Sequence, residues 1–261
     1  QDDSQVNSIY LWILLHNFYC KGGTIPLQNG IRLLNIDMDG YSKIKIPIPP
    51  IDIQKQIVEE IGKVDKSVSD AMLRIDKRET DIENLLSSLN FADSTLNIVA
   101  PFATKSIKYS DIESETYITT DNMLQNKLGV LPFKGVANIS SITEYKPEDI
   151  LISNIRPYLK KIWFANKEGG CSKDVLVLRS ADTSKYLPKY IFYMIRRDTF
   201  FDYVMEGNKD DIMKYKIPMP HIDEQKRIVS QIEALELEIT KARALIENAA
   251  SEKQTILDKY L

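Results

Sequence analysis

The amino-acid sequence predicts a mixed α+β fold, in which a mainly antiparallel-sheet domain is joined to two long helices packed as an antiparallel coiled-coil pair. Three observations predict it. A motif of 19 residues occurs twice, each copy opens a long stretch with apolar residues at heptad spacing, and short β-rich runs lie between the two stretches.

The repeated motif fixes the organisation of the chain. Residues 43–61 read KIKIPIPPIDIQKQIVEEI and residues 214–232 read KYKIPMPHIDEQKRIVSQI, at a constant offset of 171 positions. Of the 19 aligned pairs, 12 are identical, and no gap is needed. Chance is a poor explanation for such a match, so the two segments are expected to be equivalent parts of one repeated architecture.

Each motif leads into an apolar stripe with alternating steps of four and three residues. Such a heptad pattern lets a long helix pack against a partner helix. We expect helices from Asp52 to about Asn90 and from Asp223 to near Leu261, with the two aspartates as N-caps. The long connection between them favours an antiparallel pair. The stripe residues are Ile57, Ile61, Val64, Val68, Ala71 and Ile75, then Ile228, Ile232, Leu235, Ile239, Ala242 and Ile246.

Between the helices the sequence changes to short β-rich runs separated by turn residues, for example Asn166–Gly170. A mainly antiparallel sheet is expected, because the runs follow each other too closely for crossover helices. Pro188–Arg197 is expected to be a helix with Pro188 in its first turn. The expected strands are Asp149–Ser153, Lys161–Ala165 and Asp174–Leu178, with weaker candidates at Tyr117–Thr120 and Val136–Ser141.

The first 48 residues resemble only the last part of this sheet-containing segment. Ser8–Tyr19 is an apolar, helix-like run before the first Pro-x-Pro, as Tyr190–Tyr203 is before the second. The chain begins at Gln1 without an initiator methionine, and we expect it to be a fragment of a longer protein or a processed form.

Composition narrows the functional classes. The chain has 261 residues, 43% hydrophobic and 27% charged, with a formal net charge of −3, and no apolar run approaches the length of a membrane span. Two cysteines are too few for a disulfide framework or for a zinc site of four thiolates, and two histidines make a histidine-based metal site or catalytic triad close to excluded. We therefore expect no catalytic residues, no metal and no cofactor, no membrane association, and a cytoplasmic location.

Charge is uneven within the central segment. Residues 153–197 contain ten Lys and Arg against three Asp and Glu, a local balance of +7 in an acidic chain. Aromatic and amide side chains are interleaved with these bases. Lysine and arginine favour phosphate, while arginine and asparagine can also bind base edges, so the segment predicts a nucleic-acid interface. A solubilising surface loop is the alternative interpretation.

The doubled motif resembles the DNA-specificity subunit of type I restriction–modification systems. The resemblance rests on Ile46–Val58 and Ile217–Val229, and on Glu148–Tyr158, which is similar to a strand of the family's target-recognition domain. It implies that residues 1–48 are the C-terminal remnant of a first target-recognition domain and 93–219 a complete one. Residues 49–92 and 220–261 would then be the two spacer helices.

The same resemblance implies double-stranded DNA and the methyltransferase subunit of the system as partners, with docking through the helices. A homodimer through the long helices would restore two-fold recognition. Arg156 and Asn154 are the candidates for base contact, and the lysines for phosphate contact. The expected DNA-binding residues are Lys105, Lys108, Asn154, Arg156, Tyr158, Lys160, Lys161, Lys173, Arg196 and Arg197.

Two other functions stay open from the sequence. The chain would be the specificity tail of a fused adenine-N6 DNA methyltransferase if catalytic residues lie upstream of Gln1. Alternatively, it is a helical structural adaptor without DNA readout. In the adaptor hypothesis the partner contacts are the exposed parts of Leu85, Leu86, Leu89, Ile256 and Leu257.

Overall fold

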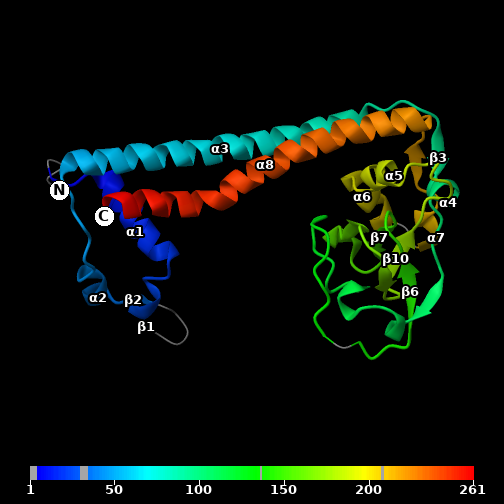
Figure 1. The fold of residues 1–261 in the computed structure, drawn as a ribbon, viewed down its shortest axis with the longest axis horizontal. Coiled ribbons are helices and arrows are strands. Elements are labelled where there is room, and N and C mark those ends of the chain that lie inside the picture. The colour runs from blue at the N-terminus through cyan, green and yellow to red at the C-terminus, as the bar shows by residue number, and fades with distance from the viewer. Residues whose placement is uncertain (1–4, 30–34, 136, 207–208) are drawn as a thin grey trace. The chain divides into compact units, whose positions relative to one another are not determined.

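The computed structural model describes residues 5–29, 35–135, 137–206 and 209–261 (Figure 1). The chain divides into two compact units. Unit 1 comprises residues 1–79 and 237–261, and unit 2 comprises residues 80–236. Two long helices, α3 (Ile51–Ser87) and α8 (Ile222–Tyr260), contribute to both units.

The apolar stripes of α3 and α8 are buried as predicted. Eight of the twelve stripe residues are buried, and the other four are half-buried. The sequence placed Asp52 and Asp223 at the N-caps, which is wrong. The helices begin one residue earlier, so both carboxylates lie in the first turn, where a negative charge interacts favourably with the helix dipole.

Ion pairs in unit 1 show that the two helices run antiparallel. Lys259 binds Glu60 at 2.9 Å and Lys253 binds Asp65, so residues late in α8 face residues early in α3. Further along, Arg243 binds Glu79 at 3.2 Å. Figure 1 shows the helices side by side. The predicted α+β fold with an antiparallel helix pair is confirmed.

A buried glutamine closes the start of α3. Gln54 is fully buried, and its side-chain amide donates to the carbonyls of Pro49 at 2.8 Å and Gln5 at 3.0 Å. Its side-chain oxygen accepts from the backbone N–H of Asn7 at 2.8 Å. Tyr10 adds a hydrogen bond from its hydroxyl to the carbonyl of Pro47 at 2.8 Å.

The start of α8 repeats this arrangement. Gln225 is fully buried and donates to the carbonyls of Pro220 at 2.8 Å and Lys185 at 2.7 Å. Its side-chain oxygen accepts from the N–H of Leu187 at 2.8 Å, and Tyr190 donates to the carbonyl of Pro218 at 2.7 Å. We call Gln54 and Gln225, with these partners, the two glutamine bridges. They show why the motif keeps glutamine after Pro-x-Pro.

Among the described residues, unit 2 contains three of the four sheets. A three-stranded antiparallel sheet has the order β10-β7-β8, and a four-stranded sheet has the order β4-β6-β9-β5, in which only the β5–β9 pair is parallel. A short antiparallel pair, β11-β3, precedes α8. The strands are β3 (Asp93–Thr95), β4 (Ser106–Lys108), β5 (Tyr117–Ile118), β6 (Ser141–Tyr145), β7 (Ile150–Ser153), β8 (Ile162–Phe164), β9 (Gly169–Cys171), β10 (Val175–Leu178) and β11 (Lys216–Pro218).

Helices cover the three-stranded sheet and form one hydrophobic core with it. Helix α5 (Pro188–Ile195) has Pro188 in its first turn, as predicted, and packs with α6 (Asp198–Glu206). The core joins the inner face of the sheet to α5, α6 and the unit 2 parts of α3 and α8. Two single-turn helices complete the unit, α4 (Leu96–Val99) and α7 (Lys209–Ile212).

The N-terminal segment of unit 1 is helical. Helix α1 (Ser8–Cys20) packs Tyr10 and Ile13 against Ile57, Ile61 and Leu257 of the long helices. Its other face carries Ile9, Trp12 and Tyr19, all exposed. The segment continues with a 3-10 turn at Ile25–Leu27, β1 (Gln28–Asn29), β2 (Asn35–Ile36) and α2 (Met38–Ser42).

Two sequence-based expectations are corrected. The strand expected at Val136–Ser141 is displaced: Val136 lies outside the described residues, and the strand is β6, Ser141–Tyr145. The leucines expected to be exposed contacts are core residues instead. Leu86 and Leu257 are buried, and Leu85, Leu89 and Ile256 are half-buried against the cores.

Candidate nucleic-acid interface

The loop that joins β7 to β8 projects the predicted base-contact residues. It contains a single 3-10 turn, Pro157–Leu159, flanked by Arg156 and Lys160. Both flanking residues have left-handed backbones, with φ of 54° and 49°. Arg156 is exposed, and the side chain of Tyr158 is 58% exposed. The loop therefore presents one guanidinium and one aromatic ring to solvent.

A second loop pairs with it through the backbone. The N–H of Asn126 donates to the carbonyl of Leu159, and that of Lys127 donates to the carbonyl of Lys160, both at 2.9 Å. Asn126 and Lys127 are also left-handed, with φ of 55° and 64°. This conformation costs a non-glycine residue about 1–2 kcal/mol. Four such residues in two facing loops persist only where the surroundings hold them, as at ligand-binding sites.

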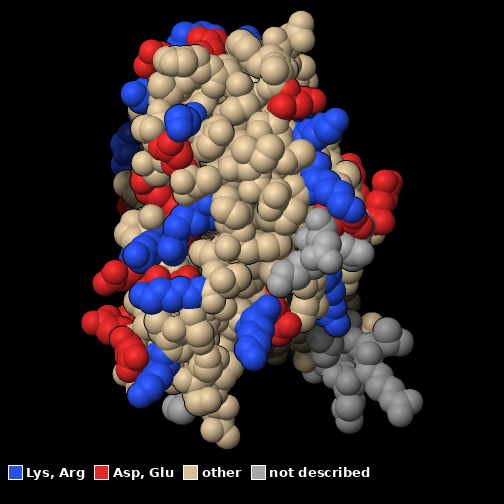
Figure 2. All heavy atoms as spheres, turned by 90° about the vertical axis from the view of Figure 1, so that its right-hand side faces the viewer, with Lys and Arg blue, Asp and Glu red and all other residues tan. Residues whose placement is uncertain are grey.

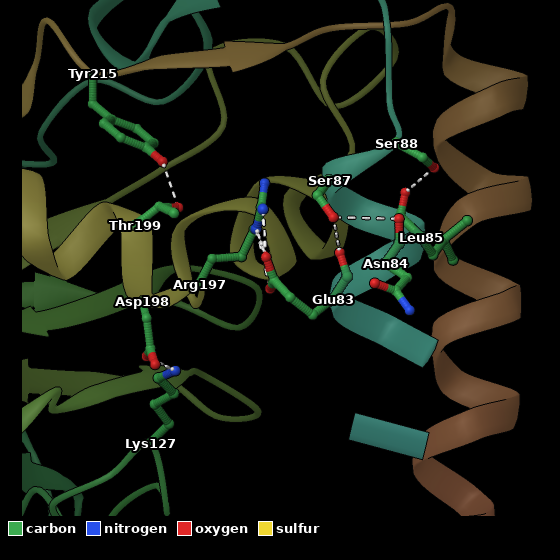
Figure 3. Close-up of polar contacts among 10 residues, drawn as sticks. All are labelled: Glu83, Asn84, Leu85, Ser87, Ser88, Lys127, Arg197, Asp198, Thr199 and Tyr215. Carbon is green, nitrogen blue, oxygen red and sulfur yellow. Dashed lines mark hydrogen bonds and ion pairs between the residues drawn. The ribbon is translucent and has the colours of Figure 1, made fainter. Parts of the chain in front are cut away.

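Asp198, at the start of α6, holds both loops. Its carboxylate binds the ammonium of Lys160 at 2.9 Å. It also binds the ammonium of Lys127 (Figure 3). The hydrogen bond from Lys127 is the main reason why the pKa of the Asp198 carboxyl lies below its usual value; Lys160 lowers it further, while burial acts in the opposite direction. One carboxylate thus joins one lysine from each left-handed pair.

The neighbours of Asp198 fix the first turn of α6. Arg197 forms an ion pair with Glu83 of α3 at 2.5 Å, and its side chain is mostly buried. The Thr199 hydroxyl lies 3.4 Å from the Tyr215 hydroxyl. Figure 3 shows the three consecutive side chains pointing to three different partners. The contacts of its two sequence neighbours therefore fix the position of Asp198.

A buried ion pair supports the strands that carry the loop. Asp149 is 2% exposed and accepts from Arg179 at 2.8 and 2.7 Å. It also accepts from the backbone N–H of Lys146 at 2.7 Å. The hydrogen bond to Asp149 is the main cause of the raised pKa of Arg179. The pair ties β7 to β10 at the end opposite the loop.

Most predicted binding residues come from this loop or beside it. Asn154, Arg156 and Tyr158 are exposed, whereas Lys160 and Lys161 are half-buried. Lys160 is bound to Asp198, and Lys161 donates to the carbonyl of Thr120. The N–H of Asn154 donates to the carbonyl of Asp174 at 2.9 Å, which places exposed Lys173 close to the start of the loop.

The remaining predicted residues lie on other elements. Lys105 binds Glu144 at 2.7 Å, and Lys108 is exposed on β4. Arg196 binds Glu236 of α8 at 2.5 Å, where the Tyr193 hydroxyl also donates. Arg197 is held by Glu83. The guanidinium groups of both arginines are thus already paired with carboxylates.

Charge is mixed rather than uniform on the face shown in Figure 2. Lys and Arg side chains alternate with Asp and Glu along its margins, and uncharged side chains fill a broad strip between them. In the part of the chain that the structure describes, no group of His, Cys, Asp and Glu is arranged to hold a metal ion. The same residues include no helix long and apolar enough to cross a bilayer.

Sequence reasoning missed Asn126, Lys127 and Asp198. Their signals were weak: asparagine tolerates a left-handed turn, and an acidic residue commonly begins a helix. It also missed Leu128, which follows the paired loop residues and is 63% exposed. Apolar side chains beside bases can contact thymine methyl groups, so these residues belong to the candidate interface.

A family model described as "Type I restriction modification DNA specificity domain" matches residues 97–248, which is more than half of the chain. The chain belongs to this family. The match includes the left-handed loops, Asp198 and the start of α8. The family that the doubled motif predicted is therefore confirmed.

Individual relatives agree with this assignment. The chain is 29% identical over 132 residues to the type I restriction enzyme EcoDI specificity subunit of Escherichia coli; the match covers 44% of this chain and only 28% of that protein. Two solved structures share the fold. The HsdS subunit of Thermoanaerobacter tengcongensis has a TM-score of 0.55 at 17% identity, covering 98% of this chain and 70% of its own. The type I restriction–modification S subunit of M. genitalium has a TM-score of 0.61 at 12% identity, covering 100% and 74%.

Proposed function

We propose that this chain recognises a DNA sequence for a type I restriction–modification system and has no catalytic role of its own. The observation that carries the proposal is the exposed β7–β8 loop, held in a left-handed conformation within a domain of a DNA-specificity family. A fixed loop suits base readout, because recognition requires side chains already aimed at base edges.

The proposed roles follow from exposure and chemistry. Arg156 would bind guanine and Asn154 adenine, in the bidentate geometry that these side chains favour. Lys108 and Lys173 are exposed and would bind phosphates, and Lys105 would bind a phosphate in place of Glu144. Tyr158 would contact sugar or base. Lys160, Lys161, Arg196 and Arg197 would act through the protein contacts that they make.

A duplex selection tests the proposal. The 261-residue chain, alone and with the methyltransferase subunit of its system, is mixed with random duplexes, and bound DNA is sequenced. We expect enrichment of a short sequence. Arg156→Ala should lose about 1–3 kcal/mol of discrimination at one base pair, whereas Lys173→Ala should weaken all sequences alike and reduce the salt slope by about one. Absence of enrichment in both arms would leave the adaptor hypothesis standing.

We also propose that the long helices bind the methyltransferase subunit. Within unit 1, Met72 and Leu73 of α3 and Leu237 and Leu245 of α8 are exposed apolar side chains on otherwise charged helices. These residues replace the leucines that sequence reasoning selected. Light scattering of the chain with and without that subunit distinguishes the complex from a homodimer through the helices.

A further inference from the structure

The two paired loops of unit 2 need an external restraint. Their backbone hydrogen bonds run from Asn126 to Leu159 and from Lys127 to Lys160, and Asn126, Lys127, Arg156 and Lys160 have left-handed backbones. None of these residues is glycine, so the isolated segments would favour other conformations. Something outside the loops must hold them.

Asp198 supplies that restraint. It binds Lys127 from one loop and Lys160 from the other, and both lysine side chains are largely withdrawn from solvent, at 22% and 28% exposed. Arg197 and Thr199 fix the helix turn on which Asp198 lies, through Glu83 and Tyr215 (Figure 3). The carboxylate is therefore a fixed point to which both loops attach.

We propose that Asp198 is a positioning residue for DNA recognition: by binding Lys127 and Lys160 together, it locks the two loops and aims Arg156 and Tyr158 at the duplex. The inference rests on the proposed function. We call Asp198 with Lys127 and Lys160 the lock. Lys160 then acts in the lock and does not bind a phosphate. A carboxylate, although DNA repels it, becomes necessary for sequence discrimination.

The lock predicts an unusual combination of effects. Asp198→Asn removes one negative charge and releases two lysines, so affinity for any duplex at low salt should hold or increase. Discrimination between the selected sequence and a scrambled one should fall by about tenfold, because Arg156 and Tyr158 are no longer aimed. A variant that merely unfolds the domain would instead lose both kinds of binding.

Asp202→Asn is the matched control. Asp202 is exposed on the same helix, and among the described residues its side chain makes no hydrogen bond or ion pair. The substitution removes the same charge without releasing a lysine. It should leave discrimination as in the wild type, while Asp198→Glu, which keeps the carboxylate, should recover more discrimination than Asp198→Asn.

Hydrogen exchange without DNA tests the lock independently. In the full chain, Asp198→Asn should speed exchange at the backbone amides of Asn126 and Lys127 by about tenfold or more, and Asp202→Asn should not. Wild-type exchange and discrimination in Asp198→Asn would overturn the inference and leave the proposed function intact. A wild-type chain without sequence preference would overturn the proposed function, and the exchange result would then decide whether Asp198 locks the loops.

Discussion

The two glutamine bridges close helix starts in different surroundings. In each, a tyrosine donates to the carbonyl of a proline, and a buried glutamine donates to the carbonyl of a second proline, two residues before the helix begins. The helices that carry the tyrosines differ. Phe192 of α5 is 9% exposed and contacts Phe164 of β8, whereas Trp12 of α1, two residues after Tyr10 as Phe192 is after Tyr190, is 60% exposed. Among the described residues, the bridge therefore forms whether the aromatic ring two residues after the tyrosine is buried or exposed.

The largest expected difference between the two regions concerns these aromatic side chains. Phe192→Ala should lower the free energy of unfolding of unit 2 by about 3–5 kcal/mol, because it leaves a cavity in the core. Trp12→Ala should cost unit 1 about 1 kcal/mol or less, since its ring stacks only on His16 in the described structure. Hydrogen exchange in increasing urea resolves the units. Equal losses of unfolding free energy in the two variants would contradict the observed difference in burial between Phe192 and Trp12.

The glutamine bridges themselves should be the next largest effect, and a shared one. Gln225→Ala removes the side-chain partner of three backbone groups, one buried and two partly buried, and should destabilise unit 2 by about 3 kcal/mol. Gln54→Ala breaks the equivalent bonds and should have a similar effect on unit 1. The same urea experiment measures both. A loss confined to Gln225 would show that the two bridges are not equivalent.

The tyrosine hydroxyls of the two bridges should have a smaller effect on stability than the glutamines. Tyr10→Phe and Tyr190→Phe each remove one hydroxyl and leave one proline carbonyl unpaired, so each should cost about 1 kcal/mol. Thermal unfolding measures the change, with Tyr41→Phe on α2 as the control because no hydrogen bond of this hydroxyl is found among the described residues. Values that differ by more than about twofold between the two bridges would break their equivalence.

The smallest expected effects are changes of stability with pH, which arise from one ion pair in each unit. The pKa of Glu60 is lowered chiefly by hydrogen bonds from Tyr260 and Lys259, and that of Asp198 chiefly by the hydrogen bond from Lys127. A lowered folded-state pKa gives stability that is present above the unfolded value, about 4, and lost as pH falls through the folded value. The stability difference between wild type and Glu60→Gln or Asp198→Asn should therefore shrink below about pH 4 in denaturant titrations.

Features governed by local pattern could be predicted from the sequence. The heptad stripes predicted the helix pair, and short β-rich runs predicted β7, β8 and β10 to within one residue at each end. Strand β9 was missed because Gly169 and Gly170 indicate a turn. In the structure these two positions leave no room for a side chain: a Cβ at Gly170 would lie 2.2 Å from a side-chain carbon of Ile142 on β6.

The candidate site was only partly predictable. Arg156 and Tyr158 follow a strand in a basic segment, so local reasoning found them. The lock joins residues 126–127, 159–160 and 198, which are brought together only by the tertiary fold and leave no periodic signal. For the same reason, Arg196 and Arg197 were chosen for their charge, although Glu236 and Glu83 already bind them.

The antiparallel register of α3 and α8 limits how such a chain can evolve. Glu60 with Lys259, Asp65 with Lys253 and Glu79 with Arg243 match positions that move in opposite directions along the sequence. An insertion in one helix alone would change the register, so that these residues would no longer face their ion-pair partners. The helix pair can lengthen only by complementary insertions in both helices, at about 10 Å for each seven residues. The distance that the pair spans therefore changes in steps of whole heptads.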